Sequence, residues 1–167
     1  PNSKIIKINA DVVNDIKAFP HVEKVGVQYS FPGIVGLGGG EIDTVVFGLD
    51  QDYLTLSNLS LTSGRLLRPD DNRAILINQA ALKAVGIDNF GTAIGKEISV
   101  NIPLDKAEAR EKSITGSFTI VGIIDSSTGS EIYIPSGLFD VAGVPTYSQA
   151  KVVVDDIGNV DGARKQI

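Results

Sequence analysis

Short runs of β-branched and aromatic residues recur along the chain, several of them with alternating apolar and polar positions. This pattern predicts a protein rich in β-strands. Residues 118–124 are almost continuously apolar, which is typical of a strand in the middle of a sheet. Small polar residues, glycine and proline separate the runs. The expected strands are residues 4–8, 22–29, 41–49, 73–77, 94–102, 118–124, 131–134 and 150–154.

Short helices are predicted between these strands, because apolar residues there recur every three or four positions. Asn9 is suited to cap a helix that runs to Phe19, where Pro20 ends it. Asn78 is suited to cap a second helix, which Gly86 closes. Residues 135–141 and 156–167 carry further helical patterns. Strands mixed with a few short helices predict an α+β fold.

Residues 31–40 (FPGIVGLGGG) form a glycine-rich link between two predicted strands. A phosphate-binding loop is one interpretation, but both the G-x-G-x-x-G pattern and the G-K-[ST] ending are missing. The favoured interpretation is the mobile tip of a β-hairpin. Apolar residues exposed on such a tip often mark a contact with a partner or a substrate. The candidate contact residues are Phe31, Ile34, Val35 and Leu37.

Composition narrows the class of protein. The 167 residues suffice for about one domain, and 43% apolar with 21% charged residues is ordinary for a globular protein. A net charge of −5 without a basic stripe disfavours nucleic acid as a partner. The lack of cysteine excludes disulfides, thiol catalysis and cysteine-bound zinc. No apolar run approaches the ~20 residues that cross a bilayer, and both chain ends suggest a piece of a larger protein.

Candidate catalytic and metal-binding residues are few. His21 is the only histidine, and it lies in no recognisable catalytic or metal-binding motif. Three acidic pairs lack the D-x-D-x-D-G calcium pattern, so turn and capping roles are favoured for them. These pairs are Asp50 with Asp52, Asp70 with Asp71, and Asp155 with Asp156. A pair of carboxylates that hydrolyses glycosidic bonds stays open as an alternative. We expect no catalytic residue, no metal site and no cofactor.

Several short motifs follow one another in a defined order. Residues 46–54 give V-x-G-L-D-x-x-Y-L, and residues 61–71 give L-x-x-G-R-x-L-x-x-x-D. The motifs I-L-I-N (75–78), I-G-K (94–96), F-T-I-V-G-I-I (118–124) and I-Y-I-P (132–135) come next. In this order they resemble the extracytoplasmic core domain of MacB/FtsX-type ABC transporter permeases. The motif residues that we interpret as structural are Gly48, Tyr53, Gly64, Arg65, Asn78, Gly95, Gly122 and Pro135.

The resemblance implies a fold of two small mixed α/β lobes. Residues 1–49 and 145–167 would form a split porter-like β-α-β lobe. Residues 50–144 would form an inserted Sabre-like lobe.

The resemblance also implies a function. Such a domain is non-catalytic and lies outside the cell membrane, in the periplasm or the extracellular space. It couples ATP-driven motion of the membrane part to a substrate, an adaptor or another partner. A cytoplasmic ATPase domain or subunit of the same transporter is implied as a partner, as are membrane helices and a homodimer. The alternatives are a free-standing extracellular binding module and a carboxylate-dependent hydrolase.

Gly64 and Arg65 form the centre of the second motif. A positive φ is expected at Gly64, because it lies at a turn where a side chain would be strained. Arg65 is interpreted as a buried or half-buried guanidinium that binds carbonyls and a carboxylate such as Asp71. Contact with a ligand is the alternative role for Arg65.

Overall fold

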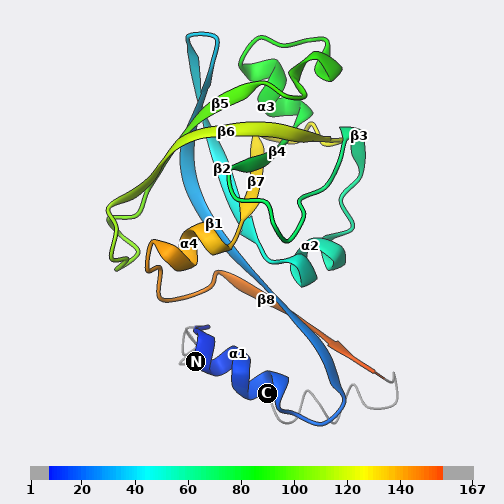
Figure 1. Cartoon of the computed structure of the whole chain (residues 1–167), viewed down its shortest axis with the longest axis vertical. Coiled ribbons are helices and arrows are strands. Elements are labelled where there is room, and N and C mark those ends of the chain that lie inside the picture. Colours follow the sequence, from blue (N-terminus) through cyan, green and yellow to red (C-terminus); the bar gives the residue numbers. More distant parts are fainter. Residues whose placement is uncertain (1–7, 156–167) are drawn as a thin grey trace, which may run out of the picture.

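The computed structural model describes residues 8–155, and within this range strands and short helices form a mixed α/β fold (Figure 1). Eight strands belong to one sheet in this range. In chain order the elements are α1 (Ala10–Lys17), β1 (Val22–Leu37), β2 (Gly40–Leu49), α2 (Gln51–Ser57), β3 (Leu61–Gly64), β4 (Ala74–Asn78), α3 (Gln79–Ala84), the 3-10 helix η1 (Phe90–Ala93), β5 (Glu97–Pro103), β6 (Ser113–Ile124), β7 (Glu131–Pro135), α4 (Gly137–Val141) and β8 (Gln149–Val154).

Six of the strands close into a ring in the order β1, β2, β7, β4, β6 and β5, and β5 pairs back to β1. The β2–β7 and β4–β6 pairs are parallel, and the other four pairs are antiparallel. Closure pairs each of these strands on both sides, so the ring is a small β-barrel. β8 pairs with β1 below the barrel, and β3 pairs with the end of β6.

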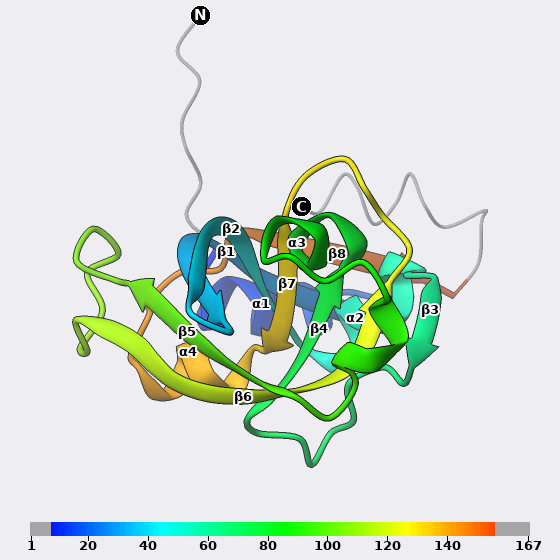
Figure 2. The ribbon, with the colours of Figure 1, turned by 90° about the horizontal axis from the view of Figure 1, so that it is seen from above.

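The inside of the barrel is the main hydrophobic core. β5 alternates strictly between exposed and buried residues, and its buried residues Ile98, Val100 and Ile102 belong to this core. Helix α3 lies over the upper end of the barrel (Figures 1 and 2). Its Ala81 and Leu82 are completely buried in the same core. The helix thus closes an end of the barrel that strands alone would leave open to water.

β1 belongs to two parts of the molecule. Its residues 28–37 pair with β2 in the barrel, and its residues 22–28 pair with β8 below the barrel (Figure 1). The strand is 16 residues long, which corresponds to roughly 50 Å of extended chain. One continuous strand therefore joins the barrel to the lower part of the molecule.

Helix α1 covers the lower sheet. The Asn9 side chain caps it by accepting a hydrogen bond from the Val12 N–H at 2.9 Å. One face of the helix buries Val13 and Ile16 in a small cluster with residues 25 and 27 of β1. This contact forms a separate lower core.

A second apolar layer covers part of the outer wall of the barrel. It consists of α2 and the segment after β3, packed against the outward side chains of β2, β4 and β7. Its buried members are Leu49, Tyr53, Leu54, Leu67, Ala74, Leu76, Ile124 and Tyr133.

Most of the predicted strands and helices are present in the described range. The capping roles of Asn9 and Asn78 are confirmed, and Gly86 closes the second helix with a φ of 91°. The strand over residues 118–124 is central, as predicted, and begins earlier, at Ser113. The predicted strand 4–8 (except for Ile8) and the predicted helix 156–167 lie outside the described residues.

The predicted hairpin is confirmed, but the prediction that residues 31–40 form its tip is wrong, because most of this segment is regular β-strand. β1 runs to Leu37, and only Gly38 and Gly39 form the turn, with φ values of 61° and 86°. Val35 is completely buried in the barrel core, and Phe31 packs against that core.

The glycines within this strand serve close packing. A Cβ at Gly33 would lie 2.7 Å from the Val46 side chain, and a Cβ at Gly36 would lie 2.7 Å from Ser99 Oγ. Neighbouring strands therefore occupy the space that side chains would need.

The pairing of the strands also bears on the predicted lobes. The barrel includes all of β2 and the second half of β1, which the prediction placed in the split lobe of residues 1–49. A boundary at Leu49 would therefore cut the ring of strands. The change between the two parts falls inside β1, near Gln28, where pairing with β8 gives way to pairing with β2.

The alternation along β1 leads to a first prediction. Val35→Ala should lower the free energy of unfolding by about 2 kcal/mol, because it leaves a cavity in the barrel core. The matched control Ile34→Ala changes an outward residue that is 36% exposed and should cost less than about 0.5–1 kcal/mol. Urea denaturation of both variants measures the difference, and equal losses would contradict the assigned strand faces.

Candidate functional site

The first motif, residues 46–54, lies where the barrel meets the lower sheet. Asp50 caps α2 by accepting a hydrogen bond from the Tyr53 N–H at 2.8 Å, and the Asp50 N–H donates to the Val27 carbonyl at 3.2 Å. A Cβ on Gly26 would clash with the backbone of Tyr53. The start of α2 thus rests directly on the backbone of β1.

The Tyr53 side chain extends this contact to β8. Its hydroxyl donates to Gln149 Oε1 at 2.7 Å and lies 3.0 Å from Gln28 Oε1. The Lys151 ammonium lies 4.7 Å from the centre of the ring. Burial raises the pKa of Tyr53, and it also raises the pKa of Asp50. Tyr53 therefore connects α2 with both strands of the lower sheet.

An aromatic cluster joins the same two parts from α4. The Tyr29 ring stacks on Phe139 with centroids 4.9 Å apart and lies 5.0 Å from the Tyr147 ring. The Tyr29 hydroxyl donates to Asp140 Oδ1 at 2.5 Å. Burial and this hydrogen bond raise the pKa of Tyr29. Sequence reasoning missed this cluster, because its members are far apart in the chain and follow no local motif.

Gly64, Arg65 and Asp71 organise the second motif. Gly64 has a φ of 80°, as expected, and the Arg65 N–H donates to the Val121 carbonyl at 2.9 Å. The Arg65 guanidinium forms two hydrogen bonds with the Asp71 carboxylate, at 2.8 and 3.1 Å. It also donates to the Leu66 carbonyl. The predicted pairing of Arg65 with Asp71 is therefore confirmed.

This ion pair closes the loop that carries Leu67 into the outer apolar layer. Asp71 also accepts a hydrogen bond from the Arg68 N–H at 2.7 Å. The hydrogen bonds from Arg65, and that from Arg68, lower the pKa of Asp71. Asp71 in turn raises the pKa of Arg65. The Arg65 guanidinium, the Asp71 carboxylate and the Arg68 N–H thus all have hydrogen-bond partners within the loop.

The other motif residues also make internal contacts. A Cβ on Gly48 would clash with the Phe139 ring, and a Cβ on Gly122 would clash with the Arg65 carbonyl. The buried Asn78 side chain accepts hydrogen bonds from the N–H groups of residues 81 and 131. Gly95 turns the chain with a φ of 87°, and Pro135 ends β7 beside Leu49.

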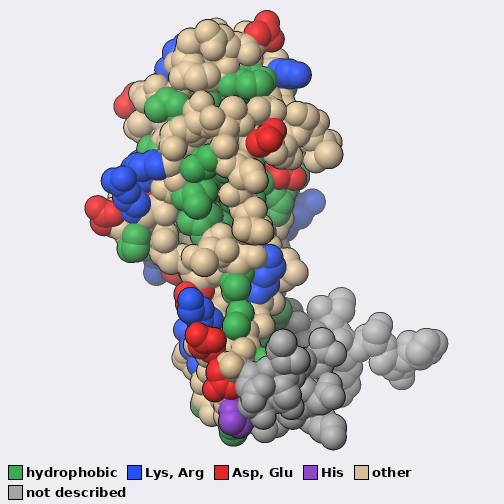
Figure 3. All heavy atoms as spheres, turned by 90° about the vertical axis from the view of Figure 1, so that its right-hand side faces the viewer, with side chains coloured by type: hydrophobic (Ala, Val, Ile, Leu, Met, Phe, Trp, Pro, Cys, Tyr) green, Lys and Arg blue, Asp and Glu red, His purple; other side chains and the backbone are tan. Residues whose placement is uncertain are grey.

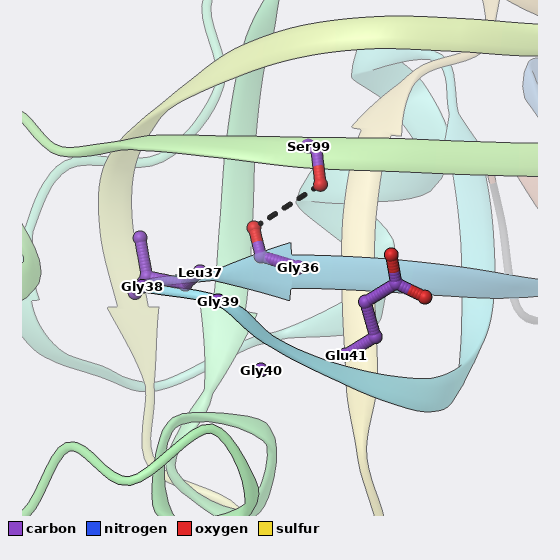
Figure 4. Close-up of a pocket in the computed structure, with 7 residues that line it drawn as sticks. All are labelled: Gly36, Leu37, Gly38, Gly39, Gly40, Glu41 and Ser99. Atoms are coloured by element: carbon purple, nitrogen blue, oxygen red, sulfur yellow. Dashed lines mark hydrogen bonds between the residues drawn. The ribbon is translucent and has the colours of Figure 1, made fainter.

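The tip of the β1–β2 hairpin holds a shallow pocket of about 180 Å³ (Figure 4). Glycines 36 and 38–40 form most of its lining, together with Leu37, Glu41 and Ser99. The Ser99 hydroxyl donates to the Gly36 carbonyl at 3.3 Å. The turn is followed by a strand and not by a helix. The charged residue in the lining of the pocket, Glu41, is an acid. The pocket thus lacks the helix start that a phosphate-binding loop provides.

Of the four predicted contact residues, only Ile34 is exposed, at 36%. Leu37 and Phe31 are half-buried against the barrel core, and Val35 is inside it. His21 lies at the lower end of the molecule, where the histidine is visible in Figure 3, and its Nδ1 is 3.3 Å from Asp155.

The described part of the chain shows no group of three metal-ligand side chains. In residues 8–155, no helix is long and apolar enough to cross a membrane. The contacts of the motif residues described above serve packing and loop closure.

Solved structures share this fold. The extracellular domain of the noncanonical ABC-type transporter YknZ from Gram-positive bacteria matches with a TM-score of 0.74 and 16% identity, over 94% of this chain and 78% of that one. The periplasmic region of MacB from Actinobacillus actinomycetemcomitans matches with a TM-score of 0.73 and 20% identity, over 96% and 72%. A domain of a putative permease from Porphyromonas gingivalis matches with a TM-score of 0.58 and 16% identity, over 96% and 71%.

The chain thus shares its fold with extracytoplasmic domains of two ABC transporters. The comparison with curated proteins gives no significant match. The family model of the MacB-like periplasmic core domain matches residues 3–167. The chain belongs to this family, which confirms the resemblance found in the sequence motifs.

The backbone at Gly64 leads to a second prediction. Gly64→Val should lower the free energy of unfolding by roughly 3 kcal/mol or more, because a Cβ there adds a clash with the Val121 carbonyl to the strain of the positive φ. The control Gly95→Val has a similar φ but open space around its Cβ and should cost only about 1–2 kcal/mol. Thermal and urea denaturation measure both. Equal losses of unfolding free energy in the two variants would contradict a clash between the new side chain and the Val121 carbonyl.

The Arg65–Asp71 pair leads to a third prediction. Arg65→Ala should lower the free energy of unfolding at pH 7 by about 1–3 kcal/mol, because Asp71 loses a charged partner at a mostly buried position. The folded-state pKa of Asp71 is lowered, so its stabilising effect is present above the unfolded pKa of about 4 and is lost as pH falls through the folded value.

The difference between wild type and Arg65→Ala should therefore shrink as the pH falls below about 4. Urea denaturation at pH 7 and at low pH measures it. Arg68→Ala is the control and should show a smaller pH-dependent loss, since the Arg68 side chain acts on Asp71 only through its charge and keeps its backbone hydrogen bond. A difference that stays constant with pH would contradict the assigned role of the ion pair.

Proposed function

We propose that the chain is a non-catalytic, extracytoplasmic domain of an ABC transporter permease that transmits ATP-driven motion of the membrane part to a partner outside the membrane. The family match over residues 3–167 carries this proposal. The internal pairing of the motif side chains supports a mechanical role, because these residues hold elements together.

The junction around Gln28 supports transmission of motion. β1 passes through it without a break, Tyr53 bridges α2 to β1 and β8, and Tyr29 bonds to Asp140 on α4. A displacement of α1 and β8 would therefore move the barrel as well. The lower part corresponds to a porter-like lobe near the membrane, and the barrel to a Sabre-like lobe farther out.

The proposal includes the setting of the domain. The full-length protein lies in the cell membrane as a homodimer, and a cytoplasmic ATPase domain or subunit of the same transporter supplies the energy. The partner outside the membrane is an adaptor or another extracytoplasmic protein. The domain itself requires no cofactor and catalyses no reaction.

Site-specific spin labelling of the full-length transporter tests this proposal, and it is our fourth prediction. The chain has no native cysteine, so Val141→Cys gives a single label at a side chain that is 72% exposed. Any cysteines elsewhere in the transporter are replaced by serine. We expect a dipolar signal between two copies, and a distance distribution that shifts when an ATPase-deficient transporter binds ATP.

The control measurements use the same labelled transporter with ADP bound and without nucleotide. An unchanged distribution on ATP binding would contradict motion of the domain. The lack of any dipolar signal would contradict the homodimer. Hydrolytic turnover by the purified 167-residue chain would contradict the non-catalytic role.

A further inference from the structure

Three apolar side chains share one outward face of the β1–β2 hairpin. Ile34 and Val45 are 36% and 42% exposed, and Pro32 is exposed beside them. Pro32 lies directly opposite Val45 in the strand register, and Ile34 is two residues along the same face. We call this surface, consisting of Pro32, Ile34 and Val45, the hairpin wall.

The hairpin wall continues the outer apolar layer beyond the point where that layer is covered. Phe47 lies on the same face as Val45, and its ring stacks on Tyr133 with centroids 5.4 Å apart. Tyr133 is buried under the outer layer, and Phe47 is half-buried at its margin. Past this margin, Pro32, Ile34 and Val45 stay partly exposed to solvent. A contiguous apolar surface of this kind is typical of an interaction site.

Acidic side chains border the hairpin wall. Asp43 lies opposite Ile34, and Glu131 of β7 lies beside Val45. Glu41 follows near the tip, opposite Gly36. The sequence has no lysine or arginine between Lys24 and Arg65, so neither hairpin strand neutralises these acids within this face.

The β5–β6 loop brings one acid and one base close to Pro32. Asp105 and Lys106 of the β5–β6 loop line a pocket of about 380 Å³ together with Phe31, Pro32, Pro103 and Ala107. These two residues bear opposite charges, so the face keeps an excess of acids.

We propose that the hairpin wall binds an extended segment of a partner protein in which apolar residues alternate with lysine or arginine. This inference rests on the proposed function and identifies its partner surface. The apolar side chains would pack on Pro32, Ile34 and Val45, and the cations would pair with Asp43 and Glu131. A second copy of this chain is disfavoured, because the same face on two copies would place these acids against each other.

A synthetic ten-residue peptide of alternating valine and lysine is the probe, and its binding is our fifth prediction. Titration of the isotope-labelled 167-residue chain, followed by NMR, should shift the amide signals of β1 residues 33–36 and of β2 residues 41–47. Asp43→Asn should weaken binding by about three- to tenfold through loss of the charge pair. The double substitution Ile34→Thr with Val45→Thr should weaken it at least about tenfold.

Matched controls separate this surface from general acidity and general exposure. Asp15→Asn removes an exposed carboxylate from α1, and Val141→Thr changes the exposed apolar residue of α4. Both controls should bind the peptide as the wild type does. Equal weakening by Asp15→Asn, equal binding of a valine–glutamate peptide, or shifts confined to other surfaces would overturn the proposal. Concentration-dependent dimerisation that Val45→Thr abolishes would overturn it in favour of a second copy.

The full-length transporter distinguishes this inference from the proposed function. The Ile34→Thr, Val45→Thr variant should keep the ATP-dependent distance change and lose peptide binding. Loss of the distance change in the unsubstituted transporter would refute the proposed function instead. Retained peptide binding by the double variant would refute the hairpin wall alone.

Discussion

The closure of the barrel by β1 and β2 is the constraint on which the other parts of the structure depend. Ten residue pairs hold these strands together, from Gln28 with Leu49 to Leu37 with Gly40. The register brings Val35 and Val46 into the core, and a shift of one residue would turn both outward. The same register points Ile34 and Val45 to the solvent. One pairing therefore determines both the core and the exposed surface of the hairpin.

The barrel also provides the base for the outer layer. α2 can lie against β1 because Gly26 has no side chain, and the Arg65–Asp71 pair holds the following loop over the barrel wall. Among the described residues, every buried side-chain nitrogen or oxygen has a hydrogen-bond partner. The motif residues thus preserve the relative positions of barrel, helices and lower sheet.

The proposed transmission of motion would require a stiff junction of this kind. Tyr53 and Tyr29 contact both parts of the molecule from different sides of β1, through residues far apart in the chain. Hinge motion at Gln28 would disturb the Tyr53 contact with Gln149 and the Tyr29 contact with Tyr147. The hairpin wall lies on the barrel, beyond this junction, so a partner bound there would follow the displacement of the lower part.

The sequence by itself determined the local structure and the family. Side-chain caps such as Asn9 and Asn78, the positive φ at Gly64, and the Arg65–Asp71 pair depend on neighbours within a few residues, so spacing predicts them. The order of the motifs predicted the family. Only the tertiary structure decided the faces of the hairpin, the closed ring and the aromatic cluster of Tyr29. These depend on which distant strands pair, and the glycines of residues 31–40 pack against such strands while resembling a loop in the sequence.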